Sequence, residues 1–346
     1  MKKNIKFWVI GIIGILIIGV IGFGAHKGKT KVGSPSETSG KNTSTDKKLI
    51  PIKTATRKDC TLAPLIVADK EGFFEKEGLK LVFTGEIKST QLLASILNGN
   101  NDLGDGHPNY IAVSIAGGAK IKAVVRSIIE PPADVDPKLR HMRWYINPSS
   151  NIKTFAELKN YKPGEKIKIN GNKNTCQDFI TNTIADNLGI SRDRFEWVVM
   201  DTDIQAIQAA KQGILDIAIS HPPFFGTAEE AKLTQIADSS DSKLGEAAGL
   251  YFYYFTEDYI NKNPETVKKF VTAVTNAQKW ANEHKDETAK LTAEFIGVPV
   301  KGNHYYSTTT KIDEKQVEPW LNDLVKNKVI PAGKVKTSDI VTHQFE

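Results

Sequence analysis

The sequence predicts an α/β protein whose folded body consists of two lobes. Apolar, strand-like runs alternate with segments of helical periodicity from residue 50 to about residue 130. The alternation stops at a group of prolines, restarts at residue 166 and gives way to a wholly helical pattern after residue 263. Strands separated by helical segments of about 10–15 residues indicate βαβ units and a mainly parallel sheet. Two such runs with a break between them predict two α/β units.

Length and composition are those of an ordinary globular chain. The 346 residues suffice for about two domains, and the contents of 40% hydrophobic and 25% charged residues exclude collagen-like, disulfide-scaffold and wholly disordered proteins. The formal net charge is +6, but residues 1–48 hold nine lysines and two acids, which leaves the rest of the chain at −1. A neutral body offers no broad phosphate-binding face, so nucleic acid is excluded as a partner.

The N-terminal segment predicts export from the cytoplasm. Residues 7–25 contain no charged side chain, and Lys2, Lys3 and Lys6 precede them. As a helix they would span roughly 28 Å, close to the hydrocarbon core of a bilayer. Residues 1–25 are therefore interpreted as an uncleaved membrane anchor or as a signal segment that is cleaved. A buried helix at the extreme terminus is a third interpretation. Both main interpretations make the body extracytoplasmic, either anchored to the membrane or secreted.

Residues 26–49 predict a flexible tether. They are rich in lysine, serine, threonine and glycine and contain almost no apolar side chain. Such a segment cannot bury enough surface to become ordered. An apolar helix, a tether and a globular body in this order are the layout of a binding module attached to the cell surface.

The first α/β unit begins directly after the tether. The helix after its first strand extends to about Glu77, the next is capped by Thr90 and ends near Gly99, and a third begins at Pro108. The predicted strands are, in order, Ile50–Thr56, Leu79–Thr84, Asp102–Gly106 and Ile121–Ile129.

The second α/β unit follows the prolines. Thr175, with Asp178 three residues later, indicates a capping box for a helix that ends at Gly189. Asp203 is the expected cap of a second helix, which ends at Gly213. The predicted strands are Lys166–Asn170, Phe195–Met200 and Ile214–Ser220.

The last part of the body is predicted to be helical. Asn263 is the expected N-cap of a long amphipathic helix with Pro264 in its first turn, and a second helix ends at Gly297. These helices are expected to cover the first unit, with the chain crossing between lobes near 126–147 and 245–257. The predicted boundaries are residues 50–142 plus 257–346 for lobe 1 and residues 143–256 for lobe 2.

Four stretches of the body resemble one known family. They are residues 63–79 (APLIVADKEGFFEKEGL), 102–108 (DLGDGHP), 204–224 with AAKQGILDIAISHPPF, and 263–297, which begins NPE. Together they resemble the solute-binding proteins of nitrate/sulfonate/taurine-type ABC transporters over about residues 50–300. The resemblance implies a periplasmic-binding-protein-like type II fold, with two crossover strands and C-terminal helices on lobe 1. The chain departs from the family in lacking a lipobox cysteine and in its long, basic segment 126–148.

The resemblance also implies a function. The chain is expected to be a monomeric, non-enzymatic component of an ABC importer that works without a cofactor. It would deliver a small anionic or polar organic solute (a sulfonate, nitrate or carboxylate) to permease and ATPase subunits. Two alternatives stay open. One is an enzyme like the fungal thiamine-pyrimidine synthases that share this fold, with Cys60 or Cys176 beside a histidine as nucleophile. The other is a surface receptor that senses a ligand for another membrane protein.

Candidate ligand-binding residues follow four predicted strand ends. Ligands of open α/β sheets lie beyond the carboxyl ends of the strands, and the resemblance implies that these four loops contact the ligand. Both cysteines of the chain and two of its seven histidines fall there. The candidates are Cys60, Thr61, Gly106, His107, Pro108, Asn172, Asn174, Thr175, Cys176 and His221.

These residue types allow two kinds of site. The backbone N–H groups at the start of the helix after Thr175 would bind an anion, helped by neighbouring asparagines. Alternatively, Cys60, His107, Cys176 and His221 would bind a soft or borderline metal such as Cu, Ni or Zn, or its chelate, although they form no local metal motif. Plainer interpretations are buried thiols, histidines that cap turns, and a Cys60–Cys176 disulfide that would tie the lobes together.

Overall fold

The structure is a computed structural model that describes residues 48–57 and 60–346, without the side chains of Cys60 and Ser89. The predicted anchor lies outside these residues, as does the predicted tether up to residue 47. Within the described part of the chain, no helix combines the length and apolar character needed to cross a bilayer.

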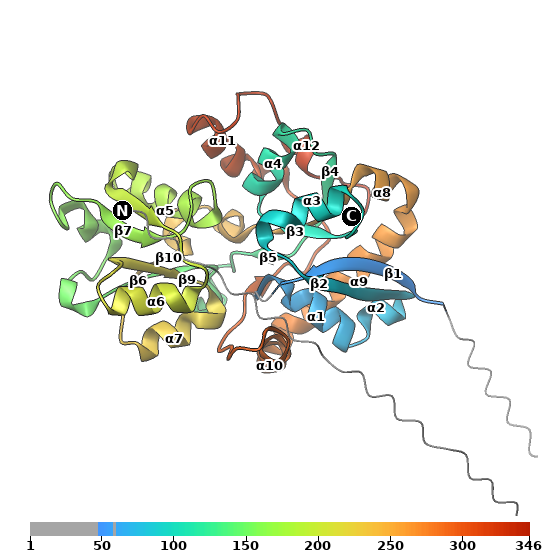
Figure 1. The fold of residues 1–346 in the computed structure, drawn as a ribbon, viewed down its shortest axis with the longest axis horizontal. Coiled ribbons are helices and arrows are strands. Elements are labelled where there is room, and N and C mark those ends of the chain that lie inside the picture. The colour runs from blue at the N-terminus through green and yellow to red at the C-terminus, as the bar shows by residue number, and fades with distance from the viewer. Residues whose placement is uncertain (1–47, 58–59) are drawn as a thin grey trace, which may run out of the picture. The chain divides into compact units, whose positions relative to one another are not determined.

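Lobe 1 contains a parallel strand pair and a three-stranded sheet (Figure 1). The pair is β1 (Ile50–Thr56) with β2 (Leu79–Glu86), and the sheet has the order β3 (Gly104–Gly106), β11 (Phe252–Thr256), β4 (Ile121–Arg126). An isolated parallel bridge between Thr54 and Leu103 connects the pair to the sheet region. The helices of this part are α1 (Ala63–Lys70), α2 (Phe73–Lys76), α3 (Leu92–Leu97) and α4 (Pro108–Ala116).

Strand β11 corrects the predicted lobe boundary. It was expected in lobe 2, as part of residues 143–256, but it pairs with both β3 and β4 in lobe 1. Both pairings are antiparallel, so β11 runs against its neighbours in a region that the sequence pattern predicted to be mainly parallel. Residues 252–255 are all fully buried, so their backbone groups need strand partners on both sides, and they find these in β3 and β4.

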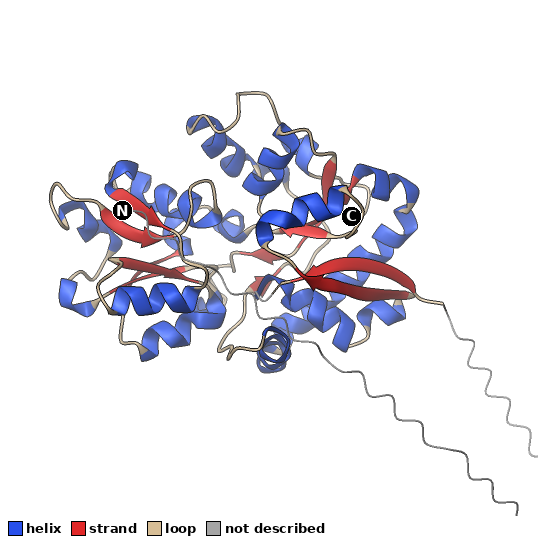
Figure 2. Ribbon diagram, in the orientation of Figure 1, coloured by secondary structure: helices blue, strands red, loops and turns tan. Residues whose placement is uncertain are grey.

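Lobe 2 contains one five-stranded sheet with the order β10-β6-β9-β7-β8, in which β7 is parallel to β8 and β9. Its strands are β6 (Arg143–Ile146), β7 (Ile167–Asn170), β8 (Phe195–Val198), β9 (Ile217–Ser220) and β10 (Thr234–Asp238). Its helices are α5 (Cys176–Asn187), α6 (Asp203–Lys211) and α7 (Phe225–Glu230). The sequence pattern did not reveal the antiparallel strands β6 and β10 (Figure 2).

The C-terminal helices pack on lobe 1, as the resemblance implied. Helix α9 (Pro264–Glu283) contacts α1 and α2, and the ring of Phe270 lies 5.8 Å from that of Phe74. The remaining elements are α8 (Glu257–Lys262), α10 (Lys285–Ile296), α11 (Glu318–Lys326), α12 (Thr337–Ile340) and the short pair β5 (Ile128–Ile129) with β12 (Tyr305–Tyr306). The expectation of a two-lobed α/β fold is confirmed.

One tryptophan joins the interiors of the two lobes. Trp320 belongs to α11, which contacts α4 of lobe 1, yet it is buried in the apolar core of lobe 2. Its ring lies 4.3 Å from that of Phe179 in α5, and its Nε1 donates a hydrogen bond of 2.9 Å to the carbonyl of Ala247. Trp320 is therefore in contact with elements on both sides of the lobe boundary.

A buried carboxylate connects the two crossover segments. The first crossover segment comprises residues 130–142, between β5 and β6, and the second comprises residues 239–251, between β10 and β11, earlier than the predicted 245–257. Glu130, in the first segment, accepts hydrogen bonds from the backbone N–H of His141 (2.9 Å) and from the hydroxyl of Ser239 (2.6 Å) in the second segment. Arg140 is its ion-pair partner at 3.4 Å. Burial raises the pKa of Glu130 to about 7, although these partners favour the charged form. The carboxylate thus holds together the two stretches of chain that lead from lobe to lobe.

Candidate functional site

A pocket of about 470 Å³ lies between residues of the two lobes. Four histidines and one cysteine line it: His107, His141, Cys176, His221 and His304. Asp201 and Asp203 also line it, and no lysine or arginine does among the residues that the structure describes. A more open hollow of about 550 Å³, bordered by charged side chains such as Lys285 and Lys301, contains none of the predicted site residues.

Four of the predicted residues reach the pocket. Thr61, His107, Cys176 and His221 line it, each directly after a strand or at the start of a helix, as expected. The side chain of Cys60 lies outside the described residues. Cys176 is a free thiol, so the alternative of a disulfide between the two cysteines is not realised.

The structure gives the other predicted residues a local role. Gly106 and Pro108 are buried at the junction of β3 and α4, where a Cβ atom on Gly106 would lie 2.8 Å from the Tyr110 ring. Asn172 and Asn174 are exposed and do not line the pocket. Thr175 is the N-cap of α5, but its hydroxyl donates to the carbonyl of Asn172 (2.6 Å) rather than forming the predicted capping box.

His107 is held in one orientation by lobe 1. It is the N-cap of α4, and its Nδ1 lies 2.8 Å from the carbonyl oxygen of Leu250, just before β11. Because a carbonyl can only accept, Nδ1 carries a proton, and Nε2 is the ring nitrogen left for a further contact. The ring stacks on Trp320 with centroids 5.1 Å apart and meets Tyr251 edge-on at 4.7 Å. This ring is therefore held in one orientation, with Nε2 available for a further contact.

Cys176 supplies the thiol of the site from lobe 2. It is the first residue of α5, at the helix end that favours negative charge. Burial opposes its ionisation, but His107 and His221 outweigh that effect and lower the pKa of the thiol to about 6. A cysteine with such a pKa is mainly a thiolate at neutral pH, the form that acts as nucleophile and metal ligand.

His221 is oriented by a carboxylate. Asp203, the first residue of α6, accepts hydrogen bonds from the backbone N–H of His221 (2.7 Å) and from its Nδ1 (2.9 Å). Burial disfavours the imidazolium, but Asp203 and then Cys176 stabilise it and raise the pKa of His221 to about 10. His221 is therefore a cation that stands between a carboxylate and a thiolate.

Two further histidines complete the cluster, and sequence reasoning missed both. His141 lies in the first crossover segment just before β6, and His304 lies in the loop after α10; each is 2% exposed. The His141 ring is 5.3 Å from His107, 5.3 Å from His304 and 5.6 Å from His221 between centroids. Burial, together with the neighbouring imidazoles, holds the pKa of both histidines well below the usual range, so both are neutral. The unusual segment 126–148 was the available signal for His141.

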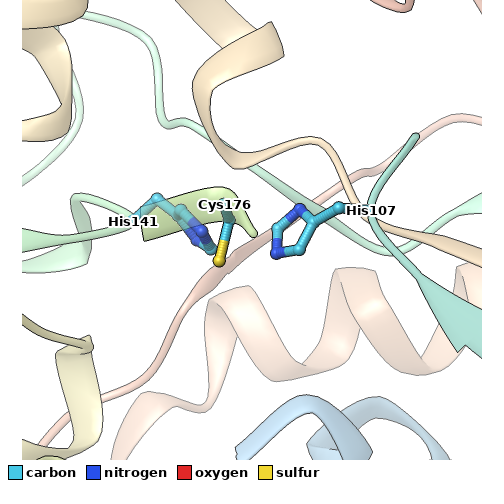
Figure 3. A group of neighbouring side chains, drawn as sticks. All are labelled: His107, His141 and Cys176. Atoms are coloured by element: carbon cyan, nitrogen blue, oxygen red, sulfur yellow. The ribbon is translucent and has the colours of Figure 1, made fainter. Parts of the chain in front are cut away.

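Three ligand-type atoms converge in this cluster. One ring nitrogen of His107, one of His141 and the sulfur of Cys176 all lie within 4.8 Å of one another. Figure 3 shows the sulfur between the two imidazole rings. Within the described part of the chain, this is the one group of three such donors. Two imidazoles and a thiolate are a donor set that suits late first-row metals.

Comparisons with known proteins agree with this architecture. Residues 60–288 match the family model described as "NMT1/THI5 like". A candidate binding protein of Brucella abortus (strain 2308) is 25% identical over 238 residues, 67% of each chain. The periplasmic aliphatic sulphonate-binding protein SsuA of Escherichia coli aligns with a TM-score of 0.65 and 17% identity, over 86% of this chain and 92% of its own. The periplasmic nitrate-binding protein NrtA of Synechocystis PCC 6803 aligns with a TM-score of 0.65 and 14% identity, over 86% and 87%.

Proposed function

The chain belongs to the NMT1/THI5-like family, and from that premise we propose that it is the extracytoplasmic solute-binding component of an ABC importer. The observation that carries the proposal is the pocket between the lobes, which is lined by polar side chains from both. The fold is also that of proteins named for binding sulfonate and nitrate. A permease and an ATPase are the partners that such a component requires, and the protein acts as a monomer.

Solute capture would close the two lobes around the bound molecule. Binding favours the closed state only through contacts that the open state lacks. The chain has such contacts: His107 of lobe 1 faces Cys176 of lobe 2, and the side-chain amide of Asn109 in α4 donates 2.8 Å to the carbonyl of Asn174. The pivots would be the crossover segments 130–142 and 239–251. The solute is small and polar, and the imidazolium of His221 and the start of α5 would receive its anionic groups.

One observation favours a second candidate function. Cys176, His221 and Asp203 form a row of nucleophilic thiolate, imidazolium and orienting carboxylate, the ion-pair arrangement of cysteine-dependent enzymes. In that case the pocket would transform its solute instead of releasing it unchanged. Recovery of the bound molecule followed by mass spectrometry separates the two functions, because a binding protein returns the same mass and a cysteine enzyme does not.

The location outside the cytoplasm leads to the first prediction. Residues 1–48 carry the apolar segment, whereas the rest of the chain has a net charge of −1. We expect the full-length chain to sediment with the membrane fraction and the chain lacking residues 1–48 to be a soluble monomer. Cell fractionation and sizing chromatography measure both. A truncated chain that still sediments with membranes would contradict the proposed anchor.

The second prediction tests solute capture itself. The truncated chain should show a raised melting temperature with at least one member of a panel of sulfonates, nitrate, carboxylates and pyrimidines. A solute present at about 100 times its Kd should stabilise the folded state by about 2.7 kcal/mol. The same solute should reduce the radius of gyration in small-angle X-ray scattering, because the lobes close. An unchanged radius at saturation would exclude closure.

A further inference from the structure

We propose that this pocket takes up a late first-row metal ion of the Cu, Ni or Zn class, alone or in a small chelate, and that His107, His141 and Cys176 bind the metal. The proposal rests on the proposed function, because it names the class of solute that the interlobe pocket captures. It differs from the sequence-based metal hypothesis in its ligands: His141 enters, and His221 becomes a positioning residue.

The distances fit a metal site that is close to its bound geometry. Zinc lies about 2.3 Å from thiolate sulfur and about 2.0 Å from imidazole nitrogen, so tetrahedral ligand atoms are roughly 3.5 Å apart. The three donor atoms here lie within 4.8 Å of one another. A movement of about 1 Å would bring them to bonding distance, which is within reach of side-chain rotation and slight lobe closure.

His141 provides independent evidence for a ligand. It is 2% exposed, and neither of its ring nitrogens has a hydrogen-bond partner among the described residues. A buried polar group without a partner is unfavourable and is rare in folded proteins. Its backbone N–H is fixed by Glu130, so the ring is held at the pocket rather than free to reach water. A metal ion can accept the electron pair of such an unpaired imidazole nitrogen.

The surroundings of His107 and Cys176 are those of metal ligands. Metal-bound histidines usually donate their second ring N–H to a carbonyl or carboxylate, which aims the other nitrogen at the metal. His107 does this through Nδ1 and the Leu250 carbonyl. His221 is aimed at Cys176 in the same way by Asp203, but its ring nitrogens are not within the 4.8 Å group, so it supports the thiolate from outside.

The origin of the three ligands connects metal binding with closure. His107 comes from lobe 1, His141 from the first crossover segment and Cys176 from lobe 2. One ion bound to all three would therefore hold both lobes and the hinge together. The pocket volume of about 470 Å³ is many times the roughly 30 Å³ of one water molecule, so it leaves room for an organic chelator at the fourth coordination position.

Cobalt provides a probe for the thiolate ligand. We would purify the full-length chain without a histidine tag in mild detergent, remove metals with EDTA, dialyse, and titrate with Co²⁺ and then with Zn²⁺. The expected result is one Co²⁺ per chain, a near-ultraviolet absorption band from thiolate–cobalt charge transfer, and loss of that band when Zn²⁺ displaces Co²⁺. Binding without such a band would overturn the proposal, because Cys176 would not be a ligand.

Variants identify the ligands. Cys176→Ser should abolish the band and weaken Zn²⁺ binding at least 100-fold, and His141→Gln should weaken it at least 10-fold. The matched control is His284→Gln, because His284 is exposed at the start of α10 and does not line the pocket. Circular dichroism of each variant checks the fold. Equal Zn²⁺ affinity in the Cys176→Ser, His141→Gln and His284→Gln variants would also overturn the proposal.

Two further experiments distinguish a free metal ion from a metal chelate, and the metal proposal from the importer proposal. The affinity for Ni²⁺ alone is compared with the affinity for Ni²⁺ preloaded with histidine. Tighter binding of Ni²⁺ alone supports a free ion as the ligand, and tighter binding of the Ni²⁺–histidine complex supports a chelate. An organic solute that binds and closes the lobes in the presence of EDTA would overturn the metal proposal and leave the importer function intact. If neither the metals nor the solute panel bind, both proposals are overturned.

Discussion

Replacing Trp320 with alanine is expected to lower the free energy of unfolding by about 3–5 kcal/mol, the usual effect of removing a large buried aromatic side chain. The side chain is fully buried and contacts the core of lobe 2. Its loss would leave a cavity beside Phe179, remove the hydrogen bond to Ala247 and expose one face of the His107 ring. Urea denaturation of the truncated chain measures the change.

The control for this prediction is Trp320→Phe. Phenylalanine keeps an aromatic ring between Phe179 and His107 but cannot donate to Ala247, so a loss of about 1–2 kcal/mol is expected. The alanine variant should also bind solute more weakly, because the His107 ring loses its stacking partner. A destabilisation below about 1 kcal/mol for Trp320→Ala would show that α11 does not contribute to the contact between the lobes.

Adding one methyl group at Gly249 is expected to destabilise the protein by about 3 kcal/mol. A Cβ atom there would lie 2.4 Å from the backbone nitrogen of Glu130 and 2.5 Å from the carbonyl carbon of Ile129. Both are main-chain atoms, at the start of the opposite crossover segment and in the residue directly before it, so neither can rotate away. Gly249→Ala must therefore push the two segments apart, and solute affinity should fall together with stability.

Gly226→Ala is the matched control for the glycine variant. The methyl group would meet only the exposed side chain of Lys301, 3.0 Å from its Cδ and 3.3 Å from its Cβ, so that this chain must turn and its Cβ shift by a few tenths of an ångström. Its effect should be within about 0.5 kcal/mol. If the urea midpoints of the two alanine variants coincide, the close approach of the crossover segments does not affect the free energy of unfolding, and the prediction is wrong.

Much of the fold was predictable because it is encoded locally. Alternating apolar runs and helix signals such as Asn263-Pro264 located β1, β2, β7 and the long α9. The lobe of β11 was not predictable, because a short apolar strand fits either sheet and only long-range pairing with β3 and β4 decides. The antiparallel strands β6 and β10 were missed for the same reason.

The site residues also fall into those that local sequence predicts and those that only long-range contacts decide. Thr61, His107, Cys176 and His221 were predicted because the carboxyl ends of strands mark where ligands bind in α/β sheets. His141 and His304 follow no such rule. His141 reaches the pocket because Glu130 fixes its backbone, and His304 because a loop after α10 returns to the pocket. Both positions depend on contacts between segments far apart in the sequence.

The carboxylate bridge of Glu130 has a mechanical consequence. Two independent linkers would allow the lobes to twist and slide as well as to open. Because Glu130 bonds to both His141 and Ser239, the two linkers are joined beside the pocket, and we expect them to bend together rather than separately. Occupancy of the pocket would then be reported mainly by the angle between the lobes. A transporter that touches the outer faces of both lobes can distinguish loaded from empty protein without touching the solute.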